Sequence, residues 1–529
     1  MGIVASLATT LLLVPLLLPF VAALVLASFF RSSVSRLRIG ATIFLLLITA
    51  SLILGILTFT SVEGRSPTGL VVAWSLPVPA GPTILNEISC RWDRFNAGLL
   101  MLLPWGAMTA SLFSGSLDTR ARRLPLSLAM LGSVNWFLTG GEIPTALTGG
   151  FLAAVFFGFL LQDSGNQESR LFGRRYQTAQ WIGLLLLTGG LGMLIGISSL
   201  VQSAPRGQPG PTTAAFIELG NVITLTQSSH EAAGEFWKDS RGLPLLTILL
   251  AILLVSGLFP LHIWLSQALS SGTLFGCVWL ILWSQSVLYA GARWLTQLDA
   301  QTLADLQSGG LFISILGTLY CSCLAYGEAR PGKFLAATVG WCLSISLLAI
   351  CSAMLHVERF AVPWSLCLSS GLVLLTIAMS PALADEQRRQ LPHRLAMRMA
   401  LITLTLTPTV IGSFQLWLGL ASLQNWGQLG TFRAWGVILV SNLFMLSGLL
   451  RMSRLLTAMV PDPVEPVNGT PVLDQFGRAC GREERLSLNE TSGFLATPPT
   501  FGQKLLIGCW IGLATLTGFL LPLANRFVL

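Results

Sequence analysis

Long apolar runs recur along this chain from one end to the other, and they constrain its fold more than any other feature. A helix needs about 20 consecutive apolar residues to cross a bilayer. Only 10% of the residues are charged, against roughly 25% in a soluble domain. The fourteen runs lie at 3–30, 39–61, 96–116, 124–141, 144–162, 177–203, 243–263, 267–294, 309–326, 334–355, 360–383, 396–420, 432–460 and 502–525. They lack the alternation of barrel strands, so we expect an all-α polytopic membrane protein with about fourteen transmembrane helices.

Basic residues are distributed unevenly between the connecting loops. Counted over alternate loops, 21 of the 31 Lys and Arg residues fall in one set and ten in the other. Because basic residues accumulate on the cytoplasmic side of a membrane, the richer set is expected in the cytoplasm and both termini outside. This pattern suits the inner membrane of a bacterial-type cell. It also explains the net charge of +8 without a nucleic-acid partner.

The spacing of the runs predicts five segments. The hydrophilic stretches 62–95, 204–242 and 461–501 are each too short for a core of their own and are expected to be caps or connectors. The last helix, which follows the third stretch, is expected to dock loosely. The segments are 1–123 with three helices, 124–294 and 309–460 with five helices each, 461–501 as a cytoplasmic linker, and 502–529 with the last helix.

Two runs contain an internal proline that is followed by aromatic residues. Pro260 lies in the seventh run, and Pro408 lies in the twelfth, with Gly412 after it. The two interrupted runs are five spans apart, which is an odd number. Two five-helix units related in this way therefore cross the bilayer in opposite directions. Broken helices at corresponding positions of inverted repeats are typical of transporters. We therefore expect two inverted five-helix repeats in which helices 7 and 12 are broken.

Four short motifs then occur in a particular order over roughly residues 90–420. The sequence Trp-Asp-Arg-Phe at 92–95 is similar to a D-x-L motif, and Phe-Pro-Leu-His-Ile-Trp-Leu at 259–265 to P-x-x-x-W-L. Gly-Lys-Phe-Leu-Ala-Ala-Thr at 332–338 is similar to K-R-x-L-A-Y-S-T, and Pro408 and Gly412 to P-P-x-x-G-F. In this order the motifs resemble the antiporter-like subunits of proton-pumping NADH-quinone oxidoreductase, a family shared with multi-subunit Na⁺/H⁺ antiporters, membrane-bound hydrogenases and two-component inorganic-carbon transporters. The resemblance implies an integral subunit whose partners are the lipid bilayer and other membrane subunits.

The chain departs from this family at the positions that relay protons. The family carries glutamate, lysine, histidine, lysine or histidine, and lysine or glutamate at these five positions. In this chain the aligned positions hold uncharged residues. The three lysines of the chain lie in loops or at helix ends. The uncharged residues are Gly150, Val255, Leu280, Ser369 and Leu416.

The remaining polar groups of the spans are candidates for an ion path. They are Ser284, Gln285, Ser286, Ser369 and Gln415, with His262 at the seventh break and Lys333 at the start of the tenth run. Polar residues of this kind also bridge neighbouring helices. Lys333 equally fits a cytoplasmic anchor, because Arg330 and the turn at 331–332 stand beside it.

No motif for a metal or a cofactor is found. The nine cysteines lack iron–sulfur spacing, and the C-x-C pair Cys321 and Cys323 would lie about 200° apart on a helix, a poor geometry for one metal. An autonomous enzyme has little support, so any enzymatic role is expected only as a subunit. Two functions stay open: a subunit of a proton- or cation-translocating complex with a reduced or altered path, and a non-conducting structural paralogue that scaffolds such a complex.

Overall fold

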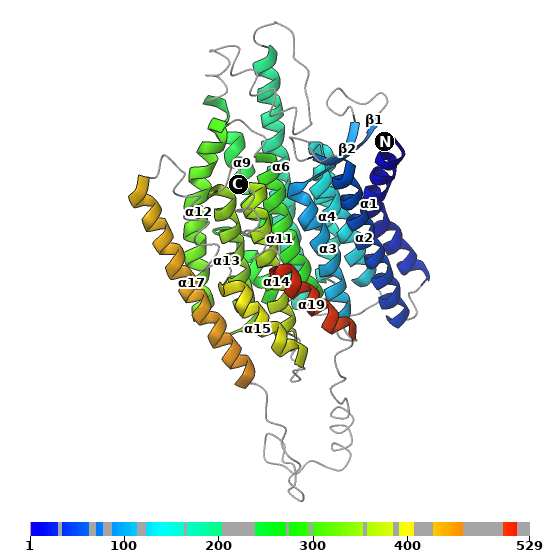
Figure 1. Ribbon diagram of the computed structural model, residues 1–529. Helices are drawn as coiled ribbons and strands as arrows, with labels where there is room; N and C mark the ends of the chain where they lie inside the picture. The colour runs from blue at the N-terminus through cyan, green and yellow to red at the C-terminus, as the bar shows by residue number, and fades with distance from the viewer. Residues whose placement is uncertain are drawn as a thin grey trace, which may run out of the picture.

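Fifteen helices of the described chain form one bundle (Figure 1). The computed structural model describes residues 2–29, 34–62, 70–77, 87–113, 123–162, 167–203, 239–270, 274–295, 300–352, 357–383, 391–406, 427–458 and 501–515. The helices are α1 (Gly2–Phe29), α2 (Val34–Val62), α3 (Arg94–Phe113), α4 (Arg123–Thr139), α5 (Ile143–Gln162), α6 (Gln167–Ser203), α9 (Gly242–Ser256), α10 (Ile263–Ser270), α11 (Leu274–Leu295), α12 (Ala300–Gly327), α13 (Pro331–Ser352), α14 (Val357–Leu383), α15 (Leu391–Leu406), α17 (Gly427–Ala458) and α19 (Phe501–Thr515).

The helical architecture is the one that the apolar runs predict. Each run overlaps at least one of the described helices. Seven of these helices have described spans long and apolar enough to cross a bilayer, and shorter apolar segments lie in α1, α3, α9, α14 and α19. This composition marks an integral membrane protein. The full count of fourteen spans and the inverted repeat stay predictions.

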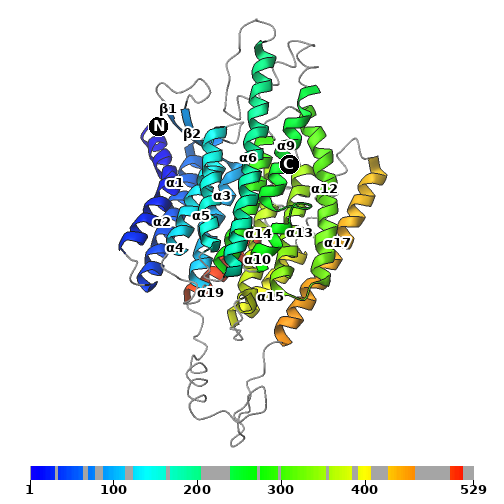
Figure 2. The same ribbon diagram turned by 180° about the vertical axis from the view of Figure 1, so that it is seen from behind.

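The centre of the bundle is helix α11. Its span Leu274–Trp294 is buried throughout, as is the span Pro331–Cys351 of α13. Helix α11 contacts α3, α4, α5, α9, α10, α13 and α14. Peripheral helices instead expose apolar side chains, as α6 does with Leu185 and Met193. Figure 2 shows α6 at the near side of the bundle. The polar residues of α11 are therefore enclosed by protein on every side.

A short β-hairpin lies at one end of the bundle, within a stretch that the sequence predicts only as a cap or connector. Strand β1 (Leu70–Pro77) pairs antiparallel with β2 (Glu87–Asp93), and Trp74 stands opposite Cys90. Cys90 also forms an isolated bridge with Gly140, after the last turn of α4. The hairpin thus covers the end of α4.

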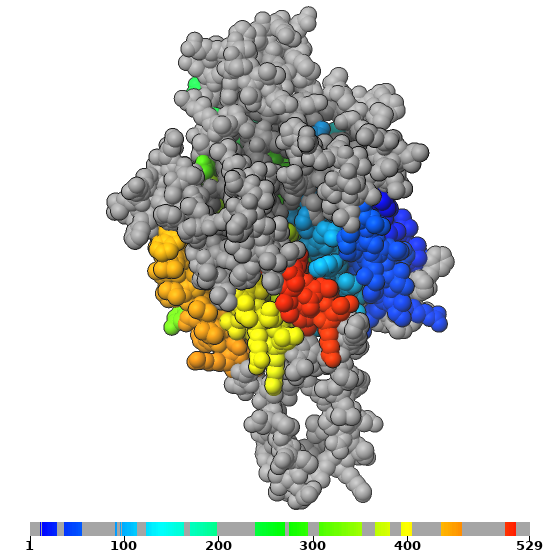
Figure 3. Space-filling view, in the orientation of Figure 1, coloured from blue at the N-terminus to red at the C-terminus, as the bar shows by residue number. Residues whose placement is uncertain are grey.

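The last helix, α19, does not dock loosely, so that expectation is wrong. Gln503 donates from Nε2 to the carbonyl of Leu112 at 3.0 Å, and Trp510 donates from Nε1 to Oγ1 of Thr109 at 2.8 Å. Trp510 is fully buried. In Figure 3, α19 lies on the surface beside α15, and it also packs on α3 and α14. Hydrogen bonds to α3 fix this helix despite its separation in sequence.

Candidate functional site

The seventh span is interrupted around Pro260. Helix α9 ends in a Schellman motif, in which Leu258 N–H donates to the Leu253 carbonyl at 2.9 Å and Gly257 N–H donates to the Leu254 carbonyl at 3.3 Å. Gly257 has a φ of 72°, the left-handed conformation that this cap requires. The chain resumes as α10 at Ile263. Residues 267–270, which the apolar pattern assigns to the eighth span, therefore belong to the second part of the seventh.

Two carbonyls at the end of α9 accept hydrogen bonds from side chains of other elements, the Leu254 carbonyl in addition to its bond from Gly257 N–H. A helix end leaves its last carbonyls without partners inside the helix. The Val255 carbonyl accepts a hydrogen bond from Nε2 of Gln180 on α6 at 3.0 Å. The Leu254 carbonyl accepts one from Nε1 of Trp264 on α10 at 2.9 Å. Gln180 also accepts, through Oε1, a hydrogen bond from Nε1 of Trp283 on α11 at 3.0 Å. We call Gln180, Trp264 and Trp283, with these two carbonyls, the break network.

Sequence reasoning missed Gln180. The residue lies near the start of the run 177–203, where a glutamine fits a helix edge at the membrane surface. In the structure it is fully buried between α6, α9 and α11. An uncharged polar residue inside an apolar run was the available signal, but the run alone does not show which face is buried.

The predicted serine and glutamine residues of α11 divide into two kinds. All three are fully buried. Ser286 donates from Oγ to the Leu282 carbonyl of its own helix at 2.7 Å, so its hydroxyl is satisfied locally. The Ser284 hydroxyl and both amide atoms of Gln285 have no hydrogen-bond partner among the described residues. Of the three, only Ser284 and Gln285 therefore keep polar atoms without a described partner.

Ser369 of α14 and Ser346 of α13 share this property. Their hydroxyls are buried and have no hydrogen-bond partner in the described part of the chain. Both helices pack on α11 and on each other. Buried polar groups are normally hydrogen-bonded, and those without a protein partner are positions where proteins enclose water. We call Ser284, Gln285, Ser346 and Ser369 the uncharged polar centre.

Contacts through α3 place Gln285 and Ser369 at similar depths. A Cβ at Gly98 would touch Leu366, and a Cβ at Gly106 would touch Leu282. The two glycines are about 12 Å apart along α3. Helix α14 crosses the bundle in the same direction as α3, and α11 crosses in the opposite direction (Figure 1). Counting from these contacts, Gln285 and Ser369 differ in depth by about 3 Å.

The other predicted site residues lie elsewhere or outside the described residues. His262 lies half-buried in the break with its ring against Phe259 and Tyr320, and its Nδ1 has no described hydrogen-bond partner. Lys333 is exposed in the first turn of α13 and is separate from the polar centre. Gln415, Pro408 and Gly412 fall in 407–426, outside the described residues, and so does the expected twelfth break.

At three of the aligned relay positions, the described side chains are packed in apolar surroundings. A Cβ at Gly150 would lie 3.1 Å from Phe137, and Val255 and Leu280 are buried in the core. Leu416 lies outside the described residues. Ser369 is the only one of the five positions with a described polar side chain.

A second buried polar group closes the end of the bundle under the hairpin. Arg293 of α11 donates to the Leu138 carbonyl at 2.7 Å, and Asn96 of α3 donates to the same carbonyl at 3.1 Å. Asn96 also donates to the Arg91 carbonyl at 2.8 Å. Burial raises the pKa of the neighbouring Cys90 thiol to about 11. These contacts join α3, α4 and α11 to strand β2.

The cysteines and other metal-ligating residues give no candidate metal centre. Cys321 is buried and Cys323 is exposed. The two thiols therefore lie on different sides of the helix, as their spacing predicts. Among the described residues, no three His, Cys, Asp or Glu side chains gather in a group that could hold a metal ion.

The fold is shared with chains of large membrane complexes. No protein-family model matches the sequence, and no curated protein matches it. A chain of the archaeal membrane-bound sulfane sulfur reductase, a respiratory membrane complex, aligns with a TM-score of 0.66 and 14% identity over 96% of each chain. A chain of the Mrp complex from Dietzia sp. DQ12-45-1b aligns with a TM-score of 0.68 and 15% identity, over 100% of this chain and 96% of the matched chain. A chain of respiratory complex I from Thermus thermophilus aligns with a TM-score of 0.59 and 17% identity, over 95% of this chain and 99% of the matched chain.

These matches agree with the order of motifs in the sequence. At such low identity they establish the fold and nothing more specific. They extend over nearly the whole of this chain and of each matched chain. The resemblance to antiporter-like subunits is therefore confirmed at the level of the fold: this chain has the fold of a membrane-embedded chain of the Mrp and respiratory complexes.

Proposed function

We propose that the chain is an antiporter-like integral subunit of a multi-subunit cation-translocating membrane complex, with a reduced ion path of its own. The observation that carries the proposal is the fold match over nearly the full length of chains from the sulfane sulfur reductase, the Mrp complex and respiratory complex I. The matches cover 95–100% of this chain. The motifs at 259–265 and 332–338 support the same assignment.

The reduced path is supported by the chemistry of the polar centre. A proton relay needs groups that bind and release protons near neutral pH. The Ser284 hydroxyl and the Gln285 amide can hydrogen-bond water but do not change charge in that range. Ser369 stands where the resembling family has a lysine or histidine. The centre therefore supports a hydrated region without titrating stations.

The alternative is a non-conducting subunit that scaffolds the complex, and the break network favours it. Carbonyls at the break of a transporter helix commonly bind the transported ion. Here those of Leu254 and Val255 are bound by Trp264 and Gln180. Both functions predict the same partners, so the ion flux separates them.

The test is flux through the purified chain in liposomes that contain a pH-sensitive dye. Under an imposed potential we expect proton entry close to that of protein-free vesicles. Rapid acidification that is abolished by Gln285→Leu would overturn the reduced path and identify the serine and glutamine residues as a conducting one. Gentle detergent extraction from the native host tests the complex, since we expect further membrane subunits to purify with the tagged chain. A chain that purifies alone would contradict the proposed subunit role.

A further inference from the structure

We infer that Gln180 is a latch that holds the broken helix closed to cations. The inference rests on the proposed function, because it assigns a state to the same broken helix. Gln180 is fully buried and uses its amide in two directions, as donor to the Val255 carbonyl and as acceptor from Trp283. One side chain thereby joins α6, the end of α9 and the central helix α11.

The position of the latch gives it a specific electrostatic effect. The C-terminal end of a helix carries a partial negative charge on its last carbonyls. In the middle of a bundle such carbonyls are the groups that attract a cation or water. The amide N–H of Gln180 occupies the Val255 carbonyl, and the indole N–H of Trp264 occupies that of Leu254. The negative end of α9 is thus neutralised by uncharged donors of the protein itself.

Removing the amide would expose two polar groups in the core at once. Gln180→Met keeps the length of the side chain but leaves the Val255 carbonyl without its donor and the Trp283 N–H without its acceptor. Val255 is itself buried, and its side chain lies against the position of a Cβ on Gly183. Water or a cation is then the available partner for the carbonyl. The latch therefore predicts that loss of one amide opens a leak.

The experiment measures Na⁺ and K⁺ efflux from proteoliposomes that contain the purified full chain. We expect Gln180→Met to raise cation efflux at least tenfold over the wild-type chain. The matched control is Gln177→Met on the same helix, whose partner Gln162 on α5 lies away from the break. Its efflux is expected to equal that of the wild type. Equal efflux from wild type and Gln180→Met, both folded by size exclusion and melting temperature, would overturn the latch.

A second variant provides a readout that a purely structural role would not change. In Gln180→Glu, the protonated carboxyl can still donate to the Val255 carbonyl and accept from Trp283. The ionised carboxylate has no donor, so the efflux should rise as pH rises through the carboxyl titration. Gln177→Glu should lack this pH profile. A flat profile in Gln180→Glu would overturn the latch even if Gln180→Met fails to fold.

The outcome is separable from that of the proposed function. The efflux measurement uses the chain alone and compares variants with one another, whereas the subunit role depends on partners that purify with the chain. If the partners are found and the variants do not leak, only the latch is wrong. If the variants leak and no partners are found, the latch stands and the subunit role is wrong.

Discussion

Gln180 and Gln285 are the same residue type, both fully buried, and they differ only in what surrounds their amides. Gln180 makes two hydrogen bonds to other helices, whereas Gln285 has no described partner. An unmade hydrogen bond in a core costs about 1–3 kcal/mol for the group left alone, while removing a group that had no partner costs little. The two glutamines should therefore respond differently to the same substitution.

For the stability of these two variants, we expect Gln180→Met to lower the unfolding free energy by about 2–4 kcal/mol, because two partners are left unpaired. Gln285→Met should stay within about 1 kcal/mol of the wild type, since it conserves volume and breaks no protein hydrogen bond. Thermal unfolding in detergent, followed by tryptophan fluorescence, compares the two. Equal losses would show that Gln285 has a partner as well anchored as that of Gln180.

Cys90 offers a prediction at the hairpin. Burial raises the pKa of its thiol to about 11, well above the ordinary value. The reactive thiolate is therefore scarce at pH 8 and forms only as the pH approaches 11. We expect iodoacetamide to leave Cys90 unmodified at pH 8 in the folded chain and to modify it in detergent-denatured chain, as read by peptide mass spectrometry. Complete modification of the folded chain at pH 8 would show that β2 does not stay on α4.

At the scale of helices, α4 and α5 approach each other very closely at Gly149. A Cβ on this residue would lie 2.4 Å from the backbone nitrogen of Phe137 and 2.9 Å from the Ser133 carbonyl oxygen. Backbone atoms cannot move aside as a side-chain end can. Small residues at such positions are how membrane helices pack closely.

We expect Gly149→Ala to separate α4 from α5 and to cost about 1–3 kcal/mol of stability, as overpacking does. The control is Gly192→Ala on α6, where an added Cβ would meet nothing within 4 Å. Melting temperatures of the two purified variants decide the matter. A Gly149→Ala chain that melts with the control would contradict the close contact of the two helices.

The sequence predicted elements well where the signal was local. Apolar length indicated the helices, and Pro260 indicated where the seventh would be interrupted. The hairpin was missed because β1 is a short apolar stretch between polar residues, too short to stand out beside membrane spans. The partners of the freed carbonyls were also missed, since Gln180 and Trp283 are 103 positions apart and meet only after folding. Local patterns do not encode such contacts.

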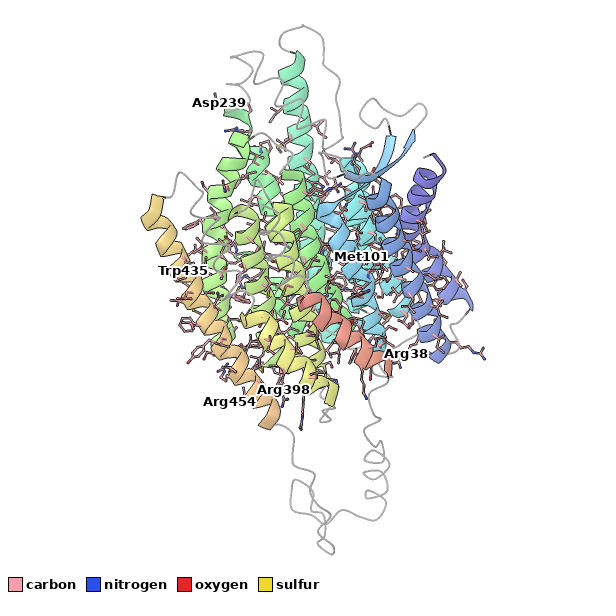
Figure 4. All side chains as sticks on the ribbon, viewed as in Figure 1. Arg38, Met101, Asp239, Arg398, Trp435 and Arg454 are labelled. Atoms are coloured by element: carbon pink, nitrogen blue, oxygen red, sulfur yellow. The ribbon has the colours of Figure 1, made fainter. Side chains whose placement is uncertain are left out.

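Three described arginines mark one end of the whole molecule. Arg38, Arg398 and Arg454 come from three separate helices and lie at the same end, whereas Asp239 lies at the opposite end (Figure 4). The loops that the charge count assigns to the cytoplasm contain or adjoin these arginines. These three arginines of the richer set of loops therefore share one end of the bundle, and the assignment of that end to the cytoplasm stays a prediction.

We expect a protease site inserted in 461–501 to be cut in inside-out membrane vesicles and protected in right-side-out vesicles. The reason is that this segment joins the basic ends of α17 and α19, which the charge rule places in the cytoplasm. A second site inserted in 204–238 is the matched control and should show the reverse pattern. Cleavage of both sites from one side would contradict the predicted orientation.

The complete enclosure of α11 has a consequence for how the chain is made. Helices leave the ribosome in order, so α11 enters the membrane before α13 and α14 have been synthesised. Until those helices arrive, the side of α11 on which they later pack is open to lipid, a costly environment for the Ser284 hydroxyl and the Gln285 amide. The amino-terminal half thus completes its own core only when the carboxyl-terminal half has been translated, and the two halves mature as one unit.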